Sequence, residues 1–443
     1  MWKLVAALVV SSLLASGCAL AQAKSAKGGY DQLNLFGEAF DRIRQDAVEP
    51  AGDMKLVGAA IAGMLSGLDG RSAYIDEPTF RAMRSPANDN EVSSGLVVTI
   101  ENGQLKVISP QDGSPAAKSG IQPGDLIFTI DKDPTYDLTL GEAEQKLRGP
   151  PGSEVELTLR RGNGEPIKVK VKREPYKLQT VTARVEAENI GYLRVAGFDS
   201  KTATTVTAAI EDLRQKMGGK LIGLILDLRN NPGGSFDAAV AVADAFIDKG
   251  DIVVVKGRKP SSVRRISATP GDVAQGVPIV ALVNGGTARE AELVAGALQD
   301  NRRAVLLGTK TFGESAIESL IPLPGNGAIR LTTARFVTPS GRKIQGKGLD
   351  PDLAVTPPKL VGLAQGERFH EADLHGALKN TDPVDADGKD ADPGAATRRV
   401  NTGPPPETVP SIKSADLGSA TDEQLSEAVD VLRGLAVITG RAG

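Results

Sequence analysis

The feature that most restricts the fold of this chain is a regular alternation of short apolar segments with helical segments from about Tyr176 onward. The apolar segments have the length and composition of buried strands. They predict strands at 190–195, 221–228, 252–255, 279–283 and 304–307. Helices are predicted at 201–217, 235–247 and 288–299. This alternation predicts a mainly parallel sheet covered by helices, with a site at the carboxyl ends of its strands.

Two different patterns precede this part of the chain. From about Glu91 to Arg173, short extended segments alternate with turns and predict strands at 105–109, 126–130, 154–160 and 167–172, with a helix at 139–147. Before them, apolar residues spaced by three to five positions predict two amphipathic helices separated by the break 49–52. These residues are Leu33, Phe36, Phe40 and Ile43, then Leu56, Ala60, Ile61, Met64 and Leu65.

Length and charge limit the classes of protein to which the chain can belong. Its 443 residues, 40% of them hydrophobic, are sufficient for several domains with their own cores. A net charge of -3 and a pI near 5.7 argue against a surface for nucleic acid or anionic lipid, because neither would be attracted. No cluster of His, Cys and Asp has metal-ligand spacing. We therefore expect no metal, no cofactor and no nucleic acid partner.

The first 23 residues have the pattern of an export signal, with Lys3 before the short apolar run 4–14. Two cleavage positions compete. One follows Ala23, and the other precedes Cys18, where the sequence is similar to a bacterial lipobox. Because Cys18 is the only cysteine, it either leaves with the signal or carries a lipid. We expect an exported, periplasmic protein that is lipid-anchored, and so bound to a membrane, only if cleavage falls before Cys18.

The C-terminal part changes composition after about Pro357. Residues 361–420 are rich in Pro, Gly, Asp and Ala, which predicts a flexible, disordered linker. Thr421 and Gln424 have the spacing of a capping box at the start of a helix over 421–443. Its apolar face would pack on the same chain or, alternatively, on a second molecule. That face consists of Leu425, Val429, Leu432 and Ala436.

The string Gly113-Ser-Pro-Ala-Ala-Lys-Ser-Gly-Ile-Gln-Pro-Gly-Asp125 resembles the short helix, glycine turn and strand of a PDZ domain. Such domains bind an extended protein C-terminus as an added strand and hold its carboxylate with loop amides. The resemblance implies that Ser93, Ser94, Gly95 and Leu96 form this loop. The alternative is a domain that only braces its neighbour.

Two loops at predicted strand ends carry the chemistry of the core. The first, Asp227-Leu-Arg-Asn-Asn-Pro-Gly-Gly234, precedes a helix, and Gly233 and Gly234 free backbone N–H groups to face an oxyanion. The second, Val283-Asn-Gly-Gly-Thr-Ala-Arg-Glu-Ala-Glu292, is followed by Thr309-Lys-Thr-Phe-Gly-Glu314. With Leu331–Phe336 and Gly346–Asp352, these strings resemble the carboxyl-terminal processing peptidases, which are PDZ-containing serine peptidases with a Ser/Lys dyad.

The resemblance extends over about residues 30 to 357 and implies a multidomain α/β protein. An N-terminal helical segment would be followed by an inserted PDZ domain and a crotonase/ClpP-like α/β core. The implied domains are an export signal (1–23), a helical region (30–86), the PDZ domain (88–174), the peptidase-like core (175–360), a linker (361–420) and a C-terminal helix (421–443).

The chain departs from the family at its catalytic positions. In active members the string Ser-Ala-Ser-Ala-Ser-Glu contains the nucleophile, and here Thr287–Glu292 puts Arg289 at that serine. The family's lysine base and its orienting glutamine match Glu314 and Glu318. A guanidinium stays protonated and is no nucleophile, so this arrangement lacks both members of the dyad. The chain is identified as a catalytically degenerate member, in which Arg289 would form an ion pair with Glu314 and Glu318. The alternative is an open pocket in which these charges are solvated.

No other residue is evident as a replacement. Thr287, Ser315 and Lys310 are close in sequence, but no base is apparent for either hydroxyl. His370 and His375 are the only histidines and lie beyond the core, which makes a Ser-His-Asp triad improbable. The carboxylates of Asp227, Asp350 and Asp352 are interpreted as turn and cap residues.

These observations predict a pseudopeptidase of the cell envelope that binds protein C-termini or unfolded proteins through its PDZ domain and regulates or scaffolds an active peptidase. The alternative is an active serine-type endopeptidase that processes the C-termini of envelope proteins. A third hypothesis is a purely structural subunit. The predicted assemblies are a homo-oligomer or a complex with an active relative.

Overall fold

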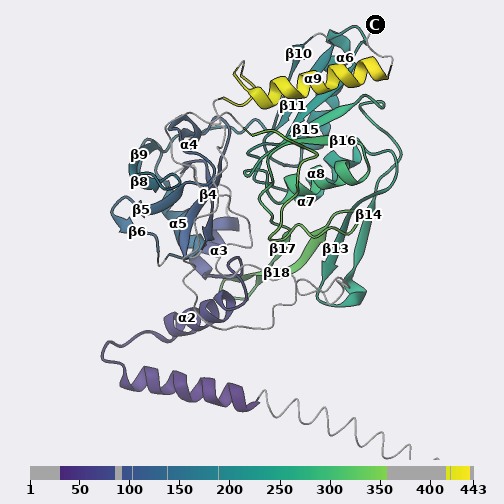
Figure 1. Cartoon of the computed structure of the whole chain (residues 1–443). Helices are drawn as coiled ribbons and strands as arrows, with labels where there is room; N and C mark the ends of the chain where they lie inside the picture. Colours follow the sequence, from purple (N-terminus) through teal and green to yellow (C-terminus); the bar gives the residue numbers. More distant parts are fainter. Residues whose placement is uncertain are drawn as a thin grey trace, which may run out of the picture. The chain divides into compact units, whose positions relative to one another are not determined.

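The computed structural model describes residues 30–84, 92–101, 103–136, 138–187, 189–356, 416–419 and 421–439 (Figure 1). The predicted export signal with Cys18 and nearly all of the predicted linker lie outside these residues. None of the described helices is both long and apolar enough to cross a membrane. The chain divides into two compact units, residues 1–64 and residues 65–443.

The first unit contains the two amphipathic helices expected from the sequence. One spans residues 30–46, and the other is α2 (Asp53–Ser66), whose last two residues belong to the second unit. The predicted break at 49–52 falls between them. Several of their apolar side chains are exposed, among them Leu33 (66%) and Ile43 (52%).

The core of the second unit is a six-stranded sheet, parallel except for its first strand. Its strands, in spatial order, are β10 (Val181–Ala187), β11 (Ile190–Val195), β12 (Gly223–Asp227), β15 (Ile279–Val283), β16 (Ala304–Gly308) and β19 (Leu353–Ala354). One face packs against α6 (Thr202–Lys216), α7 (Phe236–Asp244) and α8 (Glu290–Asp300). The other face packs against α9 (Glu423–Ile438). The predicted covered parallel sheet is confirmed.

A second, antiparallel sheet lies beside this layer. It contains β1 (Ala73–Ile75), β18 (Ala328–Val337), β13 (Asp251–Gly257), β14 (Arg264–Ser267) and β17 (Ala316–Pro322). The strand predicted at 252–255 is therefore present as β13, but its assignment to the parallel sheet was wrong. Its residues are apolar because β13 packs against α7 and α8, and periodicity does not tell which sheet a buried strand joins. Short helices are α3 (Glu77–Arg84) and η1 (Pro260–Ser262).

The predicted PDZ domain has its own core and sheet. The sheet contains β3 (Leu96–Glu101), β4 (Gln104–Pro110), β5 (Leu126–Ile130), β8 (Glu154–Arg160) and β9 (Ile167–Lys172), with β6 (Asp133–Pro134) beside β5. Its helices are α4 (Pro115–Lys118) and α5 (Leu140–Leu147), and β2 (Val92–Ser93) pairs with β7 (Arg148–Gly149). The helix predicted at 139–147 is confirmed, with a capping box between Thr139 and Glu142. In the described chain β3 is an edge strand.

The C-terminal helix α9 packs on its own chain, as the sequence predicts. Its apolar face is buried against the sheet by Leu425, Val429, Leu432 and Ala436. The predicted capping box was wrong, because Asp422 is the N-cap residue and accepts a hydrogen bond from the N–H of Leu425 (3.2 Å). Gln424 is instead turned toward the core, where it contacts Arg229 and Val355.

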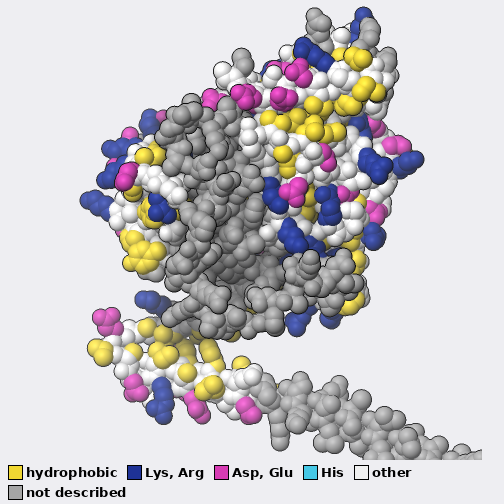
Figure 2. Space-filling view, viewed as in Figure 1, with side chains coloured by type: hydrophobic (Ala, Val, Ile, Leu, Met, Phe, Trp, Pro, Cys, Tyr) yellow, Lys and Arg dark blue, Asp and Glu magenta, His cyan; other side chains and the backbone are white. Residues whose placement is uncertain are grey.

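Charged side chains of both signs are interspersed over the described surface that faces the viewer in Figure 2. No extended patch of one sign is visible on that face. A mixed distribution of this kind creates no strong local field for a polyanionic partner.

Candidate active site

The two loops singled out from the sequence meet at the carboxyl ends of β12 and β15. The N–H of Ala288 donates a hydrogen bond to the carbonyl of Asn231 (3.0 Å), which joins them directly. Gly233 (φ 100°) and Gly234 (φ 148°) have backbone conformations that L side chains rarely adopt. A Cβ at Gly234 would lie 2.3 Å from the carbonyl oxygen of Phe198. The close approach of these two chain segments therefore requires glycine.

Arg289 belongs to the second loop and lies directly before α8. Its backbone has φ 55° and ψ -120°, an unusual conformation for a residue other than glycine. Such strain typically costs about 1–3 kcal/mol and occurs mainly at functional sites. The side chain is one-third exposed. The structure thus retains a strained strand-to-helix turn at the residue that the family string matches to the nucleophile.

Arg289 and Glu314 form the ion pair expected from the sequence. The guanidinium Nε lies 3.2 Å from Oε1 of Glu314, whose side chain is fully buried. The same Oε1 contacts Nη1 of Arg71, a nearly buried side chain in the segment before β1. The attraction of Glu314, partly opposed by burial, raises the pKa of Arg289. One buried carboxylate is therefore shared by two arginines.

Two details of this cluster differ from the sequence analysis. Glu318 is not a direct partner of Arg289, because it forms an ion pair with Arg330 of β18 (Oε2 to Nε, 3.8 Å). The pairing of β17 with β18 is irregular between Ile317 and Glu318, which changes the direction of the side chains that follow. Arg71 was not identified from the sequence. It is brought to the site by the pairing of β1 with β18, which no local pattern reveals.

Glu290 was also missed, although it occupies the centre of the site. Its carboxylate Oε2 accepts a hydrogen bond from the N–H of Gly234 (2.9 Å), and a Cβ at Gly233 would lie 2.3 Å from that oxygen. Burial raises the pKa of Glu290, while Arg289 and the N–H of Gly234 oppose this shift. The available signal was that the family string has alanine here. The amide expected to face an oxyanion is therefore already bound to a carboxylate of the same chain.

Glu292 binds backbone groups on both sides of the Arg289–Glu314 pair. Its fully buried carboxylate accepts hydrogen bonds from the N–H groups of Gly313 (2.8 Å), Glu314 (2.8 Å) and Arg289 (3.1 Å) and from the hydroxyl of Thr311. Burial raises the pKa of Glu292 to about 8, although the hydrogen bonds from Thr311, Glu314 and Gly313 lower it. The carboxylate fixes the backbones of both Arg289 and Glu314.

The remaining hydroxyls and amines near the site have structural partners. Thr287 is buried and donates its hydroxyl to the carbonyl of Leu228 (2.9 Å). Ser315 is buried beside Gln345, and Lys310 forms an ion pair with Asp350 (2.9 Å). His370 and His375 lie outside the described residues. Within the described ranges, no group of three or more His, Cys, Asp or Glu could hold a metal ion.

The structure places the predicted carboxylate-binding loop between β2 and β3. Gly95 has φ 83°, and a Cβ there would lie 2.2 Å from Cβ of Ser114, so the turn requires glycine. The N–H of Gly95 donates to the hydroxyl of Ser93 (3.1 Å). Ser94 is fully buried, its hydroxyl has no hydrogen-bond partner among the described residues, and its carbonyl accepts from the N–H of Ala116. Leu96 begins the edge strand β3, and α5 contacts that strand.

The PDZ domain and the core contact each other at this site. Ile108 of β4 forms an apolar cluster with Ala288 and Phe312, with Val97 of β3 packed against it. The hydroxyl of Ser109 donates to the carbonyl of Asn230 (2.9 Å). The strand that would bind a peptide therefore belongs to a domain that packs against the turn preceding Arg289.

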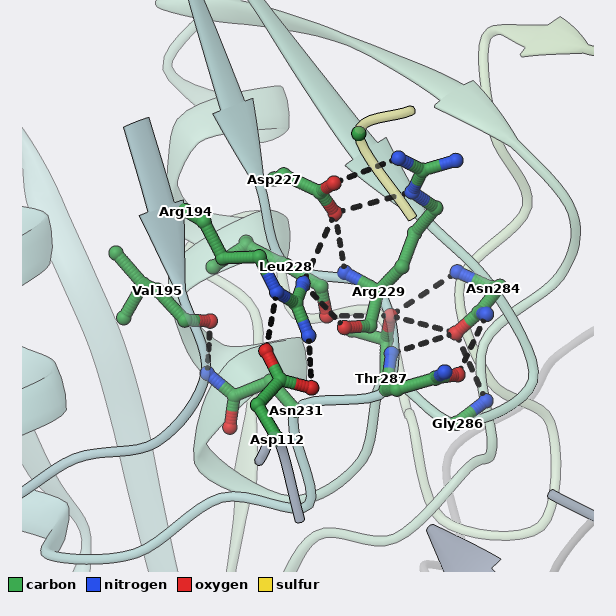
Figure 3. A network of polar contacts seen from close by, with 12 residues as sticks. Asp112, Arg194, Val195, Asp227, Leu228, Arg229, Asn231, Asn284, Gly286 and Thr287 are labelled. Atoms are coloured by element: carbon green, nitrogen blue, oxygen red, sulfur yellow. Dashed lines mark hydrogen bonds and ion pairs between the residues drawn. The ribbon is translucent and has the colours of Figure 1, made fainter. Parts of the chain in front are cut away.

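Asp227 was interpreted as a turn or cap residue, and that interpretation was incomplete. Figure 3 shows it in a network of polar contacts with Arg194 and Arg229. The carboxylate does accept from the N–H of Arg229 (3.0 Å), as in a turn. Of the other two, Asp352 accepts from the N–H of Leu306 (2.8 Å), and Asp350 pairs with Lys310.

Comparisons with known proteins agree with this architecture. Residues 189–355 match the model of Peptidase family S41, and residues 106–161 match that of a PDZ domain. The chain is 44% identical over 361 residues to a carboxy-terminal-processing protease of Bartonella bacilliformis, covering 80% of this chain and 82% of that protein. It is 32% identical over 364 residues to the carboxy-terminal processing protease CtpA of Bacillus subtilis, covering 81% and 77%.

Among solved structures, the photosystem II D1 C-terminal processing protease is similar to this chain, with a TM-score of 0.64 and 29% sequence identity. The match covers 73% of this chain and 94% of the other. Sequence and structure thus agree over the PDZ domain and the peptidase-like core, and the chain belongs to the carboxyl-terminal processing peptidases of Peptidase family S41.

Proposed function

We propose that this chain is a pseudopeptidase that binds protein C-termini without hydrolysing them. The observation that carries the proposal is the hydrogen bond between Glu290 and Gly234, beside an arginine that matches the family's nucleophile. An active site of this kind needs a nucleophile, a base and free donors for the oxyanion. The contacts of Arg289, Glu314 and Glu290 argue against all three.

Arg289 and Glu314 do not replace a serine and a lysine. A guanidinium remains protonated, and Glu314 raises the pKa of Arg289 further. Glu314 is buried and contacts two arginines, so its position offers no base for a substrate-directed hydroxyl. Loss of one member of a catalytic unit can lower turnover by about a million-fold.

Glu290 opposes the third requirement. A tetrahedral intermediate places a negative oxygen where backbone N–H groups point, and removal of one such donor lowers kcat by about 10²- to 10³-fold. Here the N–H of Gly234 is occupied, and its partner Oε2 carries negative charge when ionised. An approaching oxyanion would lose this donor and be repelled as well.

The proposed binding activity belongs to the PDZ domain. Its edge strand β3 can accept an extended peptide, and the loop 93–96 precedes that strand, as carboxylate loops do. The partners would be protein C-termini or unfolded proteins, held without cleavage. By this route the chain would regulate or scaffold an active peptidase, as a homo-oligomer or with an active relative.

The test uses the purified mature chain and a fluorescent peptide with an apolar C-terminus, made both with a free carboxylate and as an amide. We expect binding, measured by anisotropy, that is stronger for the carboxylate form, with the peptide intact by mass spectrometry. An unfolded reporter protein should likewise stay uncleaved. Cleavage that increases with protein concentration would contradict inactivity. If that cleavage persists in Thr287→Ala and Ser315→Ala, the nucleophile is a different residue. Binding of neither peptide would favour a purely structural subunit.

We further propose that the chain acts in the periplasm after export. The support is the signal pattern at residues 1–23, with lipid anchoring as the outcome if cleavage precedes Cys18. Mass spectrometry of the N-terminus of the cellular protein distinguishes the two cleavages. Cleavage after Ala23 leaves Lys24 first, whereas a lipoprotein begins with acylated Cys18. An intact Met1 would overturn the export proposal.

A further inference from the structure

A row of five buried or partly buried charges connects the PDZ domain to the C-terminal helix through the core. In order these are Asp112, Arg194, Asp227, Arg229 and Asp422, so their signs alternate. Asp112 lies between β4 and α4 of the PDZ domain, and Asp422 caps α9. The three residues between them belong to β11, to β12 and to the loop that continues to Gly233.

Asp227 is the centre of the row and is fully buried. Its Oδ1 lies 3.0 Å from Nε of Arg229 and 3.3 Å from Nη1 of Arg194. Its Oδ2 accepts from Nη2 of Arg229 (2.6 Å) and from the hydroxyl of Tyr192 (2.7 Å). Burial alone would raise the pKa of Asp227, but the two arginines lower it to about 2. One charged carboxylate is thus divided between two buried guanidinium groups.

The C-terminal helix supplies the second partner of Arg229. The carboxylate of Asp422 accepts hydrogen bonds from Nη1 (2.8 Å) and Nη2 (2.6 Å) of that fully buried side chain. The side-chain oxygen of Gln424 also accepts from Nη1 (3.0 Å). Without α9, the guanidinium would keep only Asp227 as a charged partner among the described residues. A buried charge that loses a partner is strongly unfavourable.

The PDZ end of the row has the same construction. Nε and Nη2 of Arg194 contact Asp112 (2.6 and 3.0 Å), while its Nη1 donates to the backbone carbonyl of Arg229 (2.7 Å) (Figure 3). Arg194 is therefore connected to Arg229 in two ways, through the shared carboxylate of Asp227 and through this backbone carbonyl.

We infer that docking of the C-terminal helix controls how firmly the PDZ domain is held on the peptidase-like core. If Asp422 moves away, the guanidinium of Arg229 shifts closer to Asp227, its remaining carboxylate partner. The backbone carbonyl of Arg229 moves with it. Arg194 then loses both of its core contacts, and its bridge to Asp112 loses its support. A partner that removes α9 from the sheet would release the PDZ domain, and by linkage a force on the PDZ domain would loosen α9.

The first experiment measures hydrogen exchange in the full chain carrying Asp422→Asn. The matched control is Asp430→Asn, which removes an exposed carboxylate from the same helix. We expect amide exchange to become at least about ten-fold faster in residues 106–114 and 228–231, because the free energy of local opening is lowered there. Exchange in β8 and β9, inside the PDZ domain, should not change. Faster exchange confined to α9 would overturn the inference.

The reciprocal variant keeps the inference testable if Asp422→Asn does not fold. Asp112 is partly exposed, so Asp112→Asn should fold and should accelerate exchange in α9 by a factor similar to that seen at 106–114. In the double variant the acceleration should fall short of the product of the single effects, because loss of either aspartate already weakens the contact made by the other. Unchanged exchange in α9 of Asp112→Asn would refute coupling, whatever the behaviour of the other variant.

Discussion

The carboxylate of Glu290 accepts a hydrogen bond from the N–H of Gly234 at 2.9 Å. The family resemblance predicts that this amide would be a donor for a tetrahedral oxyanion. The adjacent Arg289 has a strained backbone with φ 55°, and the proposed oxyanion donor is already occupied. Under the proposed function, the residues at 289 and 290 would therefore affect different requirements of catalysis.

This relationship predicts how the site could be rebuilt. Arg289→Ser alone should be inactive, because Glu314 still replaces the base. We expect the triple variant Arg289→Ser, Glu314→Lys and Glu318→Gln to stay inactive as well, since Glu290 still occupies the N–H of Gly234. Adding Glu290→Ala frees that donor, which is typically worth about 10²- to 10³-fold in kcat. Cleavage of an unfolded reporter protein is the measurement.

Two controls accompany the rebuilt variants. Glu290→Ala in the original background should remain inactive, because it supplies neither nucleophile nor base. Circular dichroism and thermal unfolding should show that all variants fold. If both variants cleave the reporter and the triple variant does so as fast as the quadruple variant, Glu290 does not block the donor.

The shared carboxylate of Glu314 should be important for stability. Glu314→Gln removes the charge that pairs with Arg71 and Arg289, which leaves a nearly buried Arg71 without this partner. Breaking a buried pair on one side typically lowers the free energy of unfolding by about 3–5 kcal/mol, and the partial exposure of Arg289 places our expectation at about 3 kcal/mol. Urea unfolding measures the change.

Glu318→Gln is the matched control, since it removes a carboxylate 3.8 Å from Arg330 in a partly exposed pair. Such pairs contribute about 1 kcal/mol or less. Equal losses in the two variants would mean that Glu314 is not the centre of the charge cluster.

Much of the architecture could be predicted because its signals are local. Apolar segments at 190–195 and 279–283 became strands of the parallel sheet, and the stripe from Leu425 to Ala436 became the buried face of α9. The pairing of Arg289 with Glu314 followed from a joint change of charge at two positions of a known motif. In each case spacing along the chain carries the information.

The parts that were missed depend on contacts between distant segments. Arg71 reaches Glu314 only because β1 pairs with β18, and Asp422 meets Arg229 only because α9 packs on the sheet. The sheet to which β13 belongs depends on partners, not on its own apolar pattern. Glu290 was visible in the sequence, but the direction of its side chain depends on how closely Gly233 approaches α8.

In the loop that we propose to bind a peptide carboxylate, one backbone amide already has an acceptor from the same loop. The N–H of Gly95 is bound to the hydroxyl of Ser93 (3.1 Å). Ser93→Ala removes this acceptor and should strengthen binding of the peptide with a free carboxylate by about ten-fold, corresponding to one neutral hydrogen bond. The amidated peptide should bind as before, and fluorescence anisotropy measures both. An equal gain for both forms, or a loss for the free acid, would exclude the loop as the carboxylate site.

The buried Glu292 should make stability depend on pH. Its pKa is raised from the ordinary 4.5 to about 8 because burial disfavours the charged form. The folded state therefore binds this proton more tightly than the unfolded state does. The resulting stabilisation is fully present below about pH 4.5 and is lost as the pH rises through about 8. We expect the free energy of unfolding, measured in urea, to fall between pH 5 and pH 8 more steeply than in Glu292→Gln.

The substitution removes the titrating group and keeps one acceptor oxygen, which can bind either the N–H of Gly313, as Oε1 does, or the N–H of Glu314, as Oε2 does. Glu211→Gln, on the exposed side of α6, is the control and should keep the pH dependence of the original chain. If Glu292→Gln keeps it too, the carboxylate is ionised throughout this range. Its four donors would then outweigh its burial, and the loops at Arg289 and Glu314 would be held by a permanent negative charge.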